Sequence, residues 1–175
     1  MKPSVTSTGE PLKLPFATAS RHESREWCLD LGADDVVDHR GDLPAQLAGR
    51  GHGEVDFILL AAASDPYMAL LPRLAAPQGA ICALVDTTVP HDLRPLKEKS
   101  LTFSWESMFT RSLFQTPDMI RQHEILTSVA GEVARGAVRS TLAGHFGTLG
   151  AEPLRRAHSQ VESGTTIGKI VLRGY

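Results

Sequence analysis

The chain has 175 residues, 42% of them hydrophobic, which is enough to bury one substantial core, so a single domain is the simplest prediction. Its 18 basic and 20 acidic residues give a net charge of −2 without a long run of one sign, which argues against nucleic acid and a membrane surface as partners. Cys28 and Cys82 are too few for a disulfide framework or a four-cysteine zinc site, and the N-terminus lacks the apolar core of a signal peptide. These features predict a soluble cytoplasmic protein.

Residues 1–13 are polar, contain two prolines and lack an apolar period, which predicts an irregular leader before a folded domain at 14–175. In that domain, strand-like and helix-like segments alternate. Strands are predicted at 14–20, 34–38, 55–62, 80–86, 101–106 and 167–173, and the first helices at 23–31, 42–49 and 66–75. Such alternation is typical of parallel strands joined by crossover helices. The strands at 55–62 and 80–86 are apolar at nearly every position, so we expect them in the middle of a sheet covered on both faces.

Helix ends are marked by recognisable residues. Ser20 followed by Glu23 predicts a capping box, and Gly32 stands where the first helix should stop. Thr116 and Pro117 open the longest predicted helix, in which apolar residues recur at helical spacing until Gly136. A second C-terminal helix is predicted around 154–161, ended by Gly164. The fold class that follows is α/β with a parallel sheet.

An open parallel sheet binds its ligand beyond the carboxyl ends of its strands, so the residues that follow each strand are the candidates for a site. Ser20 and Arg21 lie at the carboxyl end of the first predicted strand, where dinucleotide folds that use NAD carry an acid for the ribose hydroxyls. An arginine at that point accommodates the 2′-phosphate of NADP. The alternative is that Ser20 only caps the helix and Arg21 is a solvated surface cation.

Evidence for other kinds of site is weak. His39 follows the second predicted strand, where it could stack on an adenine or cover the edge of the sheet. The seven histidines are scattered, without an HExxH motif or a cluster with cysteines at ligand spacing, so we predict no metal site. Neither a GxGxxG loop nor a GxSxG motif occurs in the chain, although a dinucleotide site normally seats its pyrophosphate on such a glycine loop.

Five segments, taken in order, resemble one protein family. They are ATASRHESREWCLDLGADDVVDHR, GEVDFILLAA, APQGAICALVD, KEKSLTFSWESMFTRSLFQTPDM and RRAHSQVESGTTIGKIVL. Together they look like the cofactor-domain half of zinc-type alcohol dehydrogenase-like proteins, a quinone oxidoreductase branch of the medium-chain dehydrogenase/reductase superfamily. The resemblance covers residues 16–173, nearly the whole chain.

The resemblance implies an incomplete Rossmann-like, doubly wound parallel sheet. In the family, a GroES-like catalytic domain and the first strand, glycine loop and first helix of the Rossmann domain precede the segment that begins this resemblance. We therefore expect those parts to be lacking here. Zinc ligands of zinc-dependent relatives lie mostly in that preceding domain, so no zinc is expected despite the family name.

The resemblance also assigns roles to residues. Ser20 and Arg21 would recognise the 2′-phosphate of NADP(H), His39 would lie near the adenosine, and Val85 and Asp86 would lie toward the nicotinamide. The segment from Leu101 to Trp105 would be the edge of a homodimer. Substrates in the wider family are quinones, enones, alcohols and aldehydes, and the sequence identifies neither the substrate nor a catalytic residue. We expect NADP(H) to bind weakly to this chain alone, and a non-catalytic remnant or interaction module is the alternative.

Overall fold

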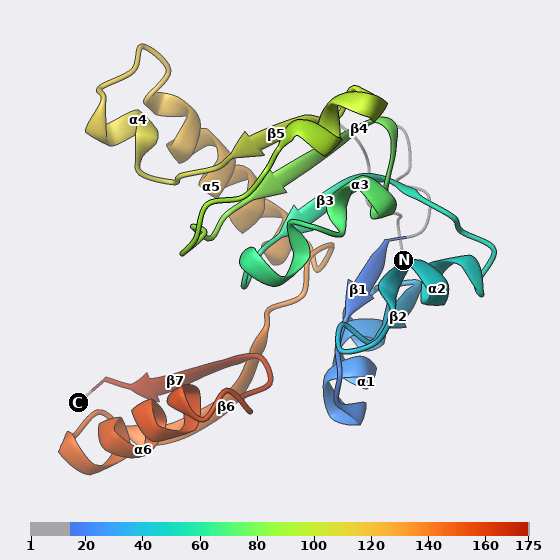
Figure 1. Ribbon diagram of the computed structural model, residues 1–175. Helices are drawn as coiled ribbons and strands as arrows, with labels where there is room; N and C mark the ends of the chain where they lie inside the picture. The colour runs from blue at the N-terminus through green and yellow to red at the C-terminus, as the bar shows by residue number, and fades with distance from the viewer. Residues whose placement is uncertain (1–14, 175) are drawn as a thin grey trace. The chain divides into compact units, whose positions relative to one another are not determined.

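The computed structural model describes residues 15–174, in which strands and helices alternate from the first strand to the last (Figure 1). The predicted leader at 1–13 lies outside the described residues. Parallel pairing joins β3 to β4, β4 to β5, and β6 to β7, whose bounds are given below. The prediction of an α/β protein with parallel strands and intervening helices is confirmed.

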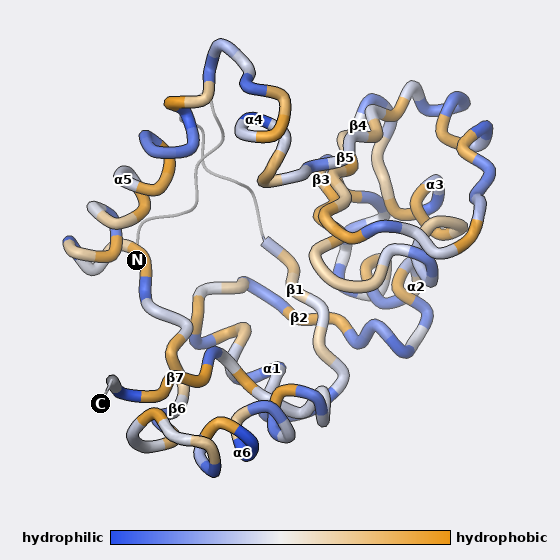
Figure 2. Tube along the Cα trace, turned by 90° about the vertical axis from the view of Figure 1, so that its left-hand side faces the viewer, coloured by the Kyte–Doolittle hydropathy of each residue, from blue (hydrophilic) through white to orange (hydrophobic). Residues whose placement is uncertain are grey.

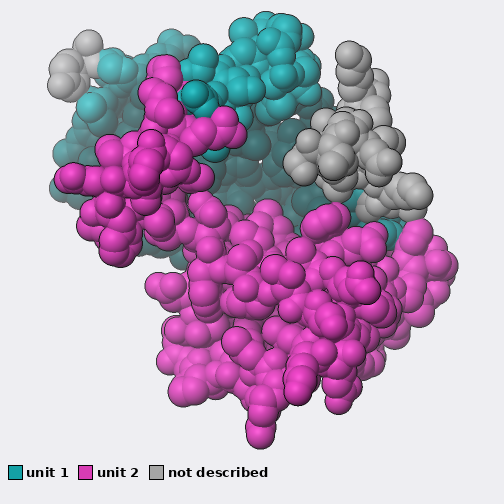
Figure 3. Space-filling model, turned by 90° about the horizontal axis from the view of Figure 1, so that it is seen from above, with its two compact units in different colours: residues 1–36, 124–175 teal, residues 37–123 magenta. Residues whose placement is uncertain are grey.

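The chain divides into two compact units, which Figure 3 colours separately. Unit 1 comprises residues 1–36 and 124–175, and unit 2 comprises residues 37–123. In unit 2 the elements are α2 (Leu43–Ala48), β3 (Val55–Leu60), η1 (Asp65–Tyr67), α3 (Leu71–Leu74), β4 (Ala75–Ala83), η2 (Arg94–Lys99), β5 (Thr102–Trp105) and α4 (Thr110–Leu113). In unit 1 they are β1 (Phe16–Thr18), α1 (His22–Leu31), β6 (Leu142–Thr148), α6 (Ala151–Glu162) and β7 (Lys169–Arg173). Strand β2 (Asp35–Val37) and helix α5 (Ile120–Ala134) extend across the unit boundaries.

The sheet of unit 2 has the order β3-β4-β5, so β4 is its central strand. Ile81 in β4 pairs with Ile58 on one side and with Phe103 on the other, and its side chain is fully buried. The core of unit 2 packs against one face of this sheet. Its buried members are Leu60, Met68, Leu71, Ala75, Ile81, Ala83 and Leu96. Burial of these aliphatic side chains supplies the main driving force for folding of the unit.

Strand β3 departs from the prediction that it is covered on both faces. Ile58 and Leu60 face the core, whereas Phe57 and Leu59 are 65% and 63% exposed. Successive strand residues point to opposite faces, so one face of β3 is open within the structure described. The apolar run therefore indicated a strand correctly but did not show which of its faces is covered.

Unit 1 contains the pair β6-β7, strand β1 with the first part of its partner β2, and helices α1 and α6. Gly168, directly before β7, has a φ of +67° and lies where a Cβ atom would be 2.5 Å from the carbonyl oxygen of Thr141 and 3.1 Å from the ring of Trp27. Trp27 belongs to α1, so the backbone at Gly168 approaches both the segment before β6 and the first helix. Only glycine combines this backbone conformation with such close contacts.

The described strands form separate hydrogen-bonded sets. Among residues 15–174, β1-β2 is one set and β3-β4-β5 is another. A complete doubly wound dinucleotide fold holds its strands in one sheet, in the order 3-2-1-4-5-6. The described strands therefore agree with a Rossmann-like fold that is incomplete.

The predicted capping box is wrong. Arg21, and not Ser20, is the N-cap residue of α1, with extended backbone angles and no capping hydrogen bond from its side chain. The chain stays extended for one residue longer than predicted, which removes the spacing that a Ser20–Glu23 box requires. At the other end of α1 the prediction is confirmed, because Gly32 adopts the left-handed conformation with a φ of 112°.

Further segments differ from the predictions. Strand β4 covers Ala75–Ala83, whereas the predicted strand is 80–86. The helix expected at 66–75 is broken into η1 and α3, and Pro72 lies in the first turn of α3 because proline is tolerated there. Strand β6, with sequence LAGHFGT, was not predicted, since its two glycines obscure the alternation of a strand. The C-terminal helix and last strand are confirmed as α6 and β7.

Helix α5 confirms the longest predicted helix, although it begins at Ile120 and not directly after Pro117. Hydrophobic and hydrophilic segments alternate along it (Figure 2). Its apolar residues Leu126, Val129 and Val133 are all exposed. None of the helices in the described part of the chain has the length and apolar character needed to cross a membrane.

Candidate functional site

Arg21 lies between the end of β1 and the start of α1, in unit 1. One Nη atom of its guanidinium donates a hydrogen bond of 2.9 Å to the carbonyl oxygen of Thr165, in the turn between α6 and β7. Ser20 is its neighbour and is partly buried. A guanidinium carries five N–H donors in a planar fork, so it can hold this carbonyl and an anionic ligand at the same time. The structure therefore fixes a cation at the carboxyl end of a strand of the sheet.

The turn that receives Arg21 has its own network of hydroxyl groups. The Ser163 hydroxyl donates a hydrogen bond of 2.7 Å to the carbonyl oxygen of Gln160 and lies 2.7 Å from the hydroxyl of Thr165. The Thr166 hydroxyl donates to the same Gln160 carbonyl, also over 2.7 Å. Gly164 has a φ of +66°, so the chain reverses at this point after α6. The carbonyl that Arg21 binds is thus held in a turn with several hydrogen bonds.

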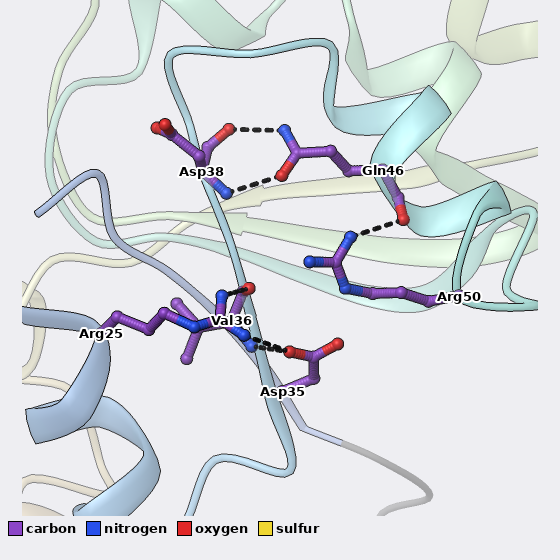
Figure 4. A network of polar contacts seen from close by, with 6 residues as sticks. All are labelled: Arg25, Asp35, Val36, Asp38, Gln46 and Arg50. Carbon is purple, nitrogen blue, oxygen red and sulfur yellow. Dashed lines mark hydrogen bonds and ion pairs between the residues drawn. The ribbon is translucent and has the colours of Figure 1, made fainter. Parts of the chain in front are cut away.

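His39 lies in the loop after β2 and is partly buried in unit 2. The loop is held by Gln46 of α2, whose side-chain amide accepts from the backbone N–H of Asp38 and donates to the Asp38 carbonyl, each over 2.8 Å (Figure 4). The Asp38 carboxylate also accepts from the backbone N–H of Arg40 at 2.9 Å. These contacts fix the backbone on both sides of His39.

The strand before that loop is tied to α1 in unit 1. Arg25 of α1 donates one hydrogen bond to the Asp35 carboxylate at 3.1 Å and another to the carbonyl of Val36 (Figure 4). Val36 is fully buried. Arg25 therefore has a structural role within unit 1 and is distinct from Arg21, whose side chain reaches the C-terminal turn.

Val85 and Asp86 follow β4 in unit 2, and both are exposed. The hydroxyl of Ser64, which is 1% exposed, donates a hydrogen bond of 2.5 Å to the carbonyl oxygen of Val85. Within unit 2, no hydrogen bond among the described residues links His39 to Val85 or to Asp86. The structure thus joins the chain after β3 to the chain after β4, as expected for neighbouring parallel strands.

Asp65, next to Ser64, is the centre of a polar cluster that the sequence analysis did not identify. One of its carboxylate oxygens lies 2.6 Å from Nε2 of His91, and the other accepts from the Thr88 hydroxyl at 2.6 Å and from the Thr88 backbone N–H at 3.0 Å. These hydrogen bonds lower the pKa of Asp65 to about 2, and the one from His91 has the largest effect, followed by those from Thr88. Asp65 and His91 are 26 positions apart, and only the pairing of β3 with β4 brings their segments together.

The arrangement of possible metal ligands can be followed in residues 15–174. In the part of the chain that it describes, three or more His, Cys, Asp or Glu side chains are nowhere gathered so that they could hold a metal. Cys28 and Cys82 are free thiols that lie in different units.

Comparison with known proteins gives consistent matches over most of the chain. The family model described as zinc-binding dehydrogenase matches residues 31–172. A zinc-type alcohol dehydrogenase-like protein of Staphylococcus aureus is 39% identical over 157 residues, which are 90% of this chain and 47% of that protein. A similar protein of Staphylococcus epidermidis is 36% identical over the same length, again 90% of this chain and 47% of that protein.

Solved structures agree with the sequence matches. A putative zinc-dependent alcohol dehydrogenase of Rhizobium etli is 39% identical, with a TM-score of 0.83 over 91% of this chain and 46% of that one. The mycobacterial protein Rv1454c, solved in complex with NADPH, is 25% identical with a TM-score of 0.70 over 90% of this chain and 48% of that one.

The chain spans about half the length of the curated relatives that it matches. The part that it shares with them is a Rossmann-like cofactor-binding domain. Because the family model covers most of the chain, and the sequence and structural matches lead to the same group of proteins, this chain belongs to the zinc-binding dehydrogenase family.

Proposed function

We propose that this chain is the NADP(H)-binding portion of an oxidoreductase in the quinone oxidoreductase branch of the medium-chain dehydrogenases and reductases. The observation that carries the proposal is the position of Arg21, which follows β1 directly and precedes α1. NAD-binding folds have an acid at the end of this strand, and that acid would repel a 2′-phosphate. A guanidinium there attracts the phosphate and can bind it through two N–H groups.

The remaining candidate residues divide by the part of the cofactor that they would contact. Ser20 offers a hydroxyl beside Arg21 for the same phosphate, and His39 offers a flat ring for the adenine. Val85 and Asp86 would lie toward the nicotinamide, at the carboxyl end of the central strand β4. The NADPH complex of the mycobacterial relative supports this choice of cofactor. When bound, the nicotinamide supplies the hydride that would reduce a carbonyl, quinone or enone.

Zinc has no part in the proposal. The family name refers to this metal, but the described residues do not fit a zinc site because their His, Cys, Asp and Glu side chains form no group of three or more. We therefore expect the chain to carry no zinc. We also propose a cytoplasmic location, for which the two free thiols are the supporting observation.

A homodimer through residues 101–105 is part of the same proposal. Strand β5 is an outer strand of its sheet and pairs with β4 on one side. Trp105 is 51% exposed and packs edge-on against Phe103, with ring centroids 5.2 Å apart. An apolar outer strand is suited to pair with another chain. The same edge supports the second candidate function, that of an interaction module without catalytic activity.

The experiment that tests the proposed function is a titration of the wild type and Arg21→Ala with NADPH and NADH. We expect weak binding overall, because no glycine loop is present in the sequence to hold the pyrophosphate. NADPH should bind more tightly than NADH by about tenfold or more, since a charge-assisted hydrogen bond contributes about 1.5–3 kcal/mol. Arg21→Ala should abolish that preference. Equal affinities that do not depend on Arg21 would overturn the assignment.

An NADPH-oxidation assay with quinone and enone acceptors tests the catalytic part. We expect no turnover from this chain alone. Groups that orient the substrate against the cofactor supply a large share of catalytic power, and the sequence identifies no such group. If the purified wild type turns over an acceptor and Arg21→Ala does not, the complete reaction would instead be assigned to this chain. Binding without a preference for NADPH, together with self-association, would favour the interaction module.

A further inference from the structure

The loop after β4 lacks hydrogen-bonded regular structure of its own. Residues 84–93 contain neither helix nor strand, and the segment includes Val85 and Asp86, the candidates for the nicotinamide end of the cofactor. Leu84, Val85 and Val89 are 45%, 39% and 52% exposed, so little burial holds the loop in place. Its conformation must therefore depend on specific contacts with the rest of unit 2.

Two adjacent residues of the loop after β3 provide those contacts. The buried Ser64 hydroxyl binds the carbonyl oxygen of Val85 at 2.5 Å. Asp65 binds the next part of the loop, through the backbone N–H and hydroxyl of Thr88 and through the ring of His91. The loop of residues 84–91 is thus attached at three points to residues 64 and 65.

A carboxylate suits the second position for a chemical reason. Three groups approach Asp65, and an ionised carboxylate accepts on both oxygens, whereas an amide would offer one acceptor oxygen and one donor nitrogen. An asparagine would place its NH₂ group against a donor of Thr88 or against the His91 ring. Hydrogen bonds to an ionised acceptor are also stronger than those between neutral groups.

We propose that Asp65 is a positioning residue that holds the 84–91 loop in the conformation that receives the nicotinamide half of the cofactor. This role rests on the proposed function, because it assumes that Val85 and Asp86 face the cofactor. Asp65 itself need not touch the cofactor. It acts through Thr88 and His91, and a loop ordered in advance costs less free energy to bind than one ordered by the ligand.

The test compares NADPH with adenosine 2′,5′-bisphosphate, which has the 2′-phosphate and adenosine but lacks the nicotinamide. Asp65→Asn should weaken NADPH binding about tenfold, the factor that corresponds to about 1.4 kcal/mol. Its affinity for adenosine 2′,5′-bisphosphate should change less than about twofold. Hydrogen exchange at the Thr88 amide should become faster in the variant without ligand, which reports the loop directly.

Asp92→Asn is the matched control. Asp92 is an exposed acid next to His91, and its carboxylate accepts hydrogen bonds from Arg94, two residues along the chain. It should leave Thr88 exchange and both affinities unchanged. A second pair avoids any change at Asp65. Thr88→Val replaces the hydroxyl with a methyl group in a side chain of the same shape and should weaken NADPH binding. Thr88→Ser keeps the hydroxyl and should bind NADPH as tightly as the wild type.

The outcomes separate this role from the proposed function. If the wild type binds NADPH more tightly than NADH, and Asp65→Asn binds NADPH as tightly as the wild type does, the positioning role is wrong and the proposed function stands. The role is also wrong if Asp65→Asn weakens both ligands to the same extent, or if Thr88→Val and Thr88→Ser bind NADPH alike. A wild type that binds neither ligand contradicts the proposed function and, with it, the role of Asp65.

Discussion

The guanidinium of Arg21 donates a hydrogen bond of 2.9 Å to the carbonyl oxygen of Thr165, which lies 144 positions further along the chain. The contact joins the beginning of α1 to the turn between α6 and β7, both within unit 1. Arg21 therefore stabilises the C-terminal turn in addition to the role in phosphate recognition that we propose. A substitution at Arg21 should have a structural effect that is measurable without any cofactor.

Arg21→Ala should loosen the turn at Ser163 to Thr166. Loss of one side-chain hydrogen bond to a carbonyl corresponds to about 1 kcal/mol, so exchange at the Thr165 amide should accelerate about fivefold. Hydrogen exchange followed by NMR checks this. Arg73→Ala, which removes an exposed arginine from unit 2, should leave Thr165 unaffected. Unchanged exchange in Arg21→Ala would mean that the contact adds nothing to the stability of the turn.

Gly168→Ala should destabilise unit 1 much more than Gly164→Ala. Both glycines have nearly the same left-handed φ, +67° and +66°, but a Cβ at Gly164 meets no atom within 4 Å. The backbone penalty alone is about 1–2 kcal/mol, and it applies to both variants. At Gly168 the overlap with Thr141 and Trp27 adds a steric cost, so a total loss of about 3 kcal/mol or more is expected.

Urea unfolding of the two glycine variants, followed through the combined fluorescence of Trp27 and Trp105, measures the difference. The pair is matched in backbone conformation, so any additional loss at Gly168 reports the close approach of the backbone to its neighbours. Equal losses of stability in the two variants would contradict this packing.

Asp65 should make stability depend on pH in the acid range. Its pKa is lowered to about 2 in the folded chain by His91 and Thr88, and the ordinary value is near 3.9. A depressed folded pKa stabilises the fold at pH values above the ordinary pKa, and this contribution is lost as the pH falls through about 2. Asp65→Asn should therefore lose stability relative to the wild type at neutral pH, with the difference shrinking between about pH 4 and pH 2.

Urea midpoints of the wild type and Asp65→Asn across that range provide the measurement. Glu98→Gln, at an exposed position of η2, serves as the control for removal of an acid. A difference between wild type and Asp65→Asn that stays constant from pH 5 to pH 2 would contradict the linkage. Asp92 and Asp118 also have lowered pKa values, through hydrogen bonds from Arg94 and from Thr116 and Arg111, so some acid dependence should remain in the variant.

Trp105→Lys should shift the chain toward a monomer. The substitution places a charge on the outer strand β5, where it would face the partner chain in an edge-to-edge dimer. Size-exclusion chromatography with light scattering measures the mass directly. Ala48→Lys introduces the same charge at an exposed position of α2 and should leave the mass unchanged. If Trp105→Lys keeps the mass of the wild type, the proposed dimer edge is in the wrong place.

Purified chain should contain well under one equivalent of zinc. The described His, Cys, Asp and Glu side chains form no group suited to the tetrahedral coordination that zinc requires. Metal analysis by mass spectrometry, after purification without added metal, checks this expectation. Zinc near one equivalent that resists dialysis would require ligands that come together in a way not seen in the structure.

Periodicity and turn residues predicted the elements of this protein well. The apolar runs around Ile58 and Ile81 are strands, and Gly32 ends α1 as predicted, because a left-handed helix end favours glycine strongly. Segments with conflicting signals were predicted poorly. Strand β6 contains two glycines, and the helix expected at 66–75 is broken before Pro72, which lies in the first turn of α3. In such segments, local preference is weak and tertiary contacts decide the conformation.

The candidate site divides in the same way. The sequence by itself determined that Arg21 comes after the first described strand and that no acid stands there, because an apolar run indicates a strand from pattern alone. The exact ends differ, since the strand predicted at 14–20 is Phe16–Thr18. Tertiary structure decided what Arg21 contacts in unit 1 and which residues hold the loop after β4. Thr165 is distant from Arg21 in sequence, and His91 from Asp65, and no local period relates residues so far apart. Only the turn after α6 and the parallel pairing of β3 with β4 bring them within hydrogen-bond distance.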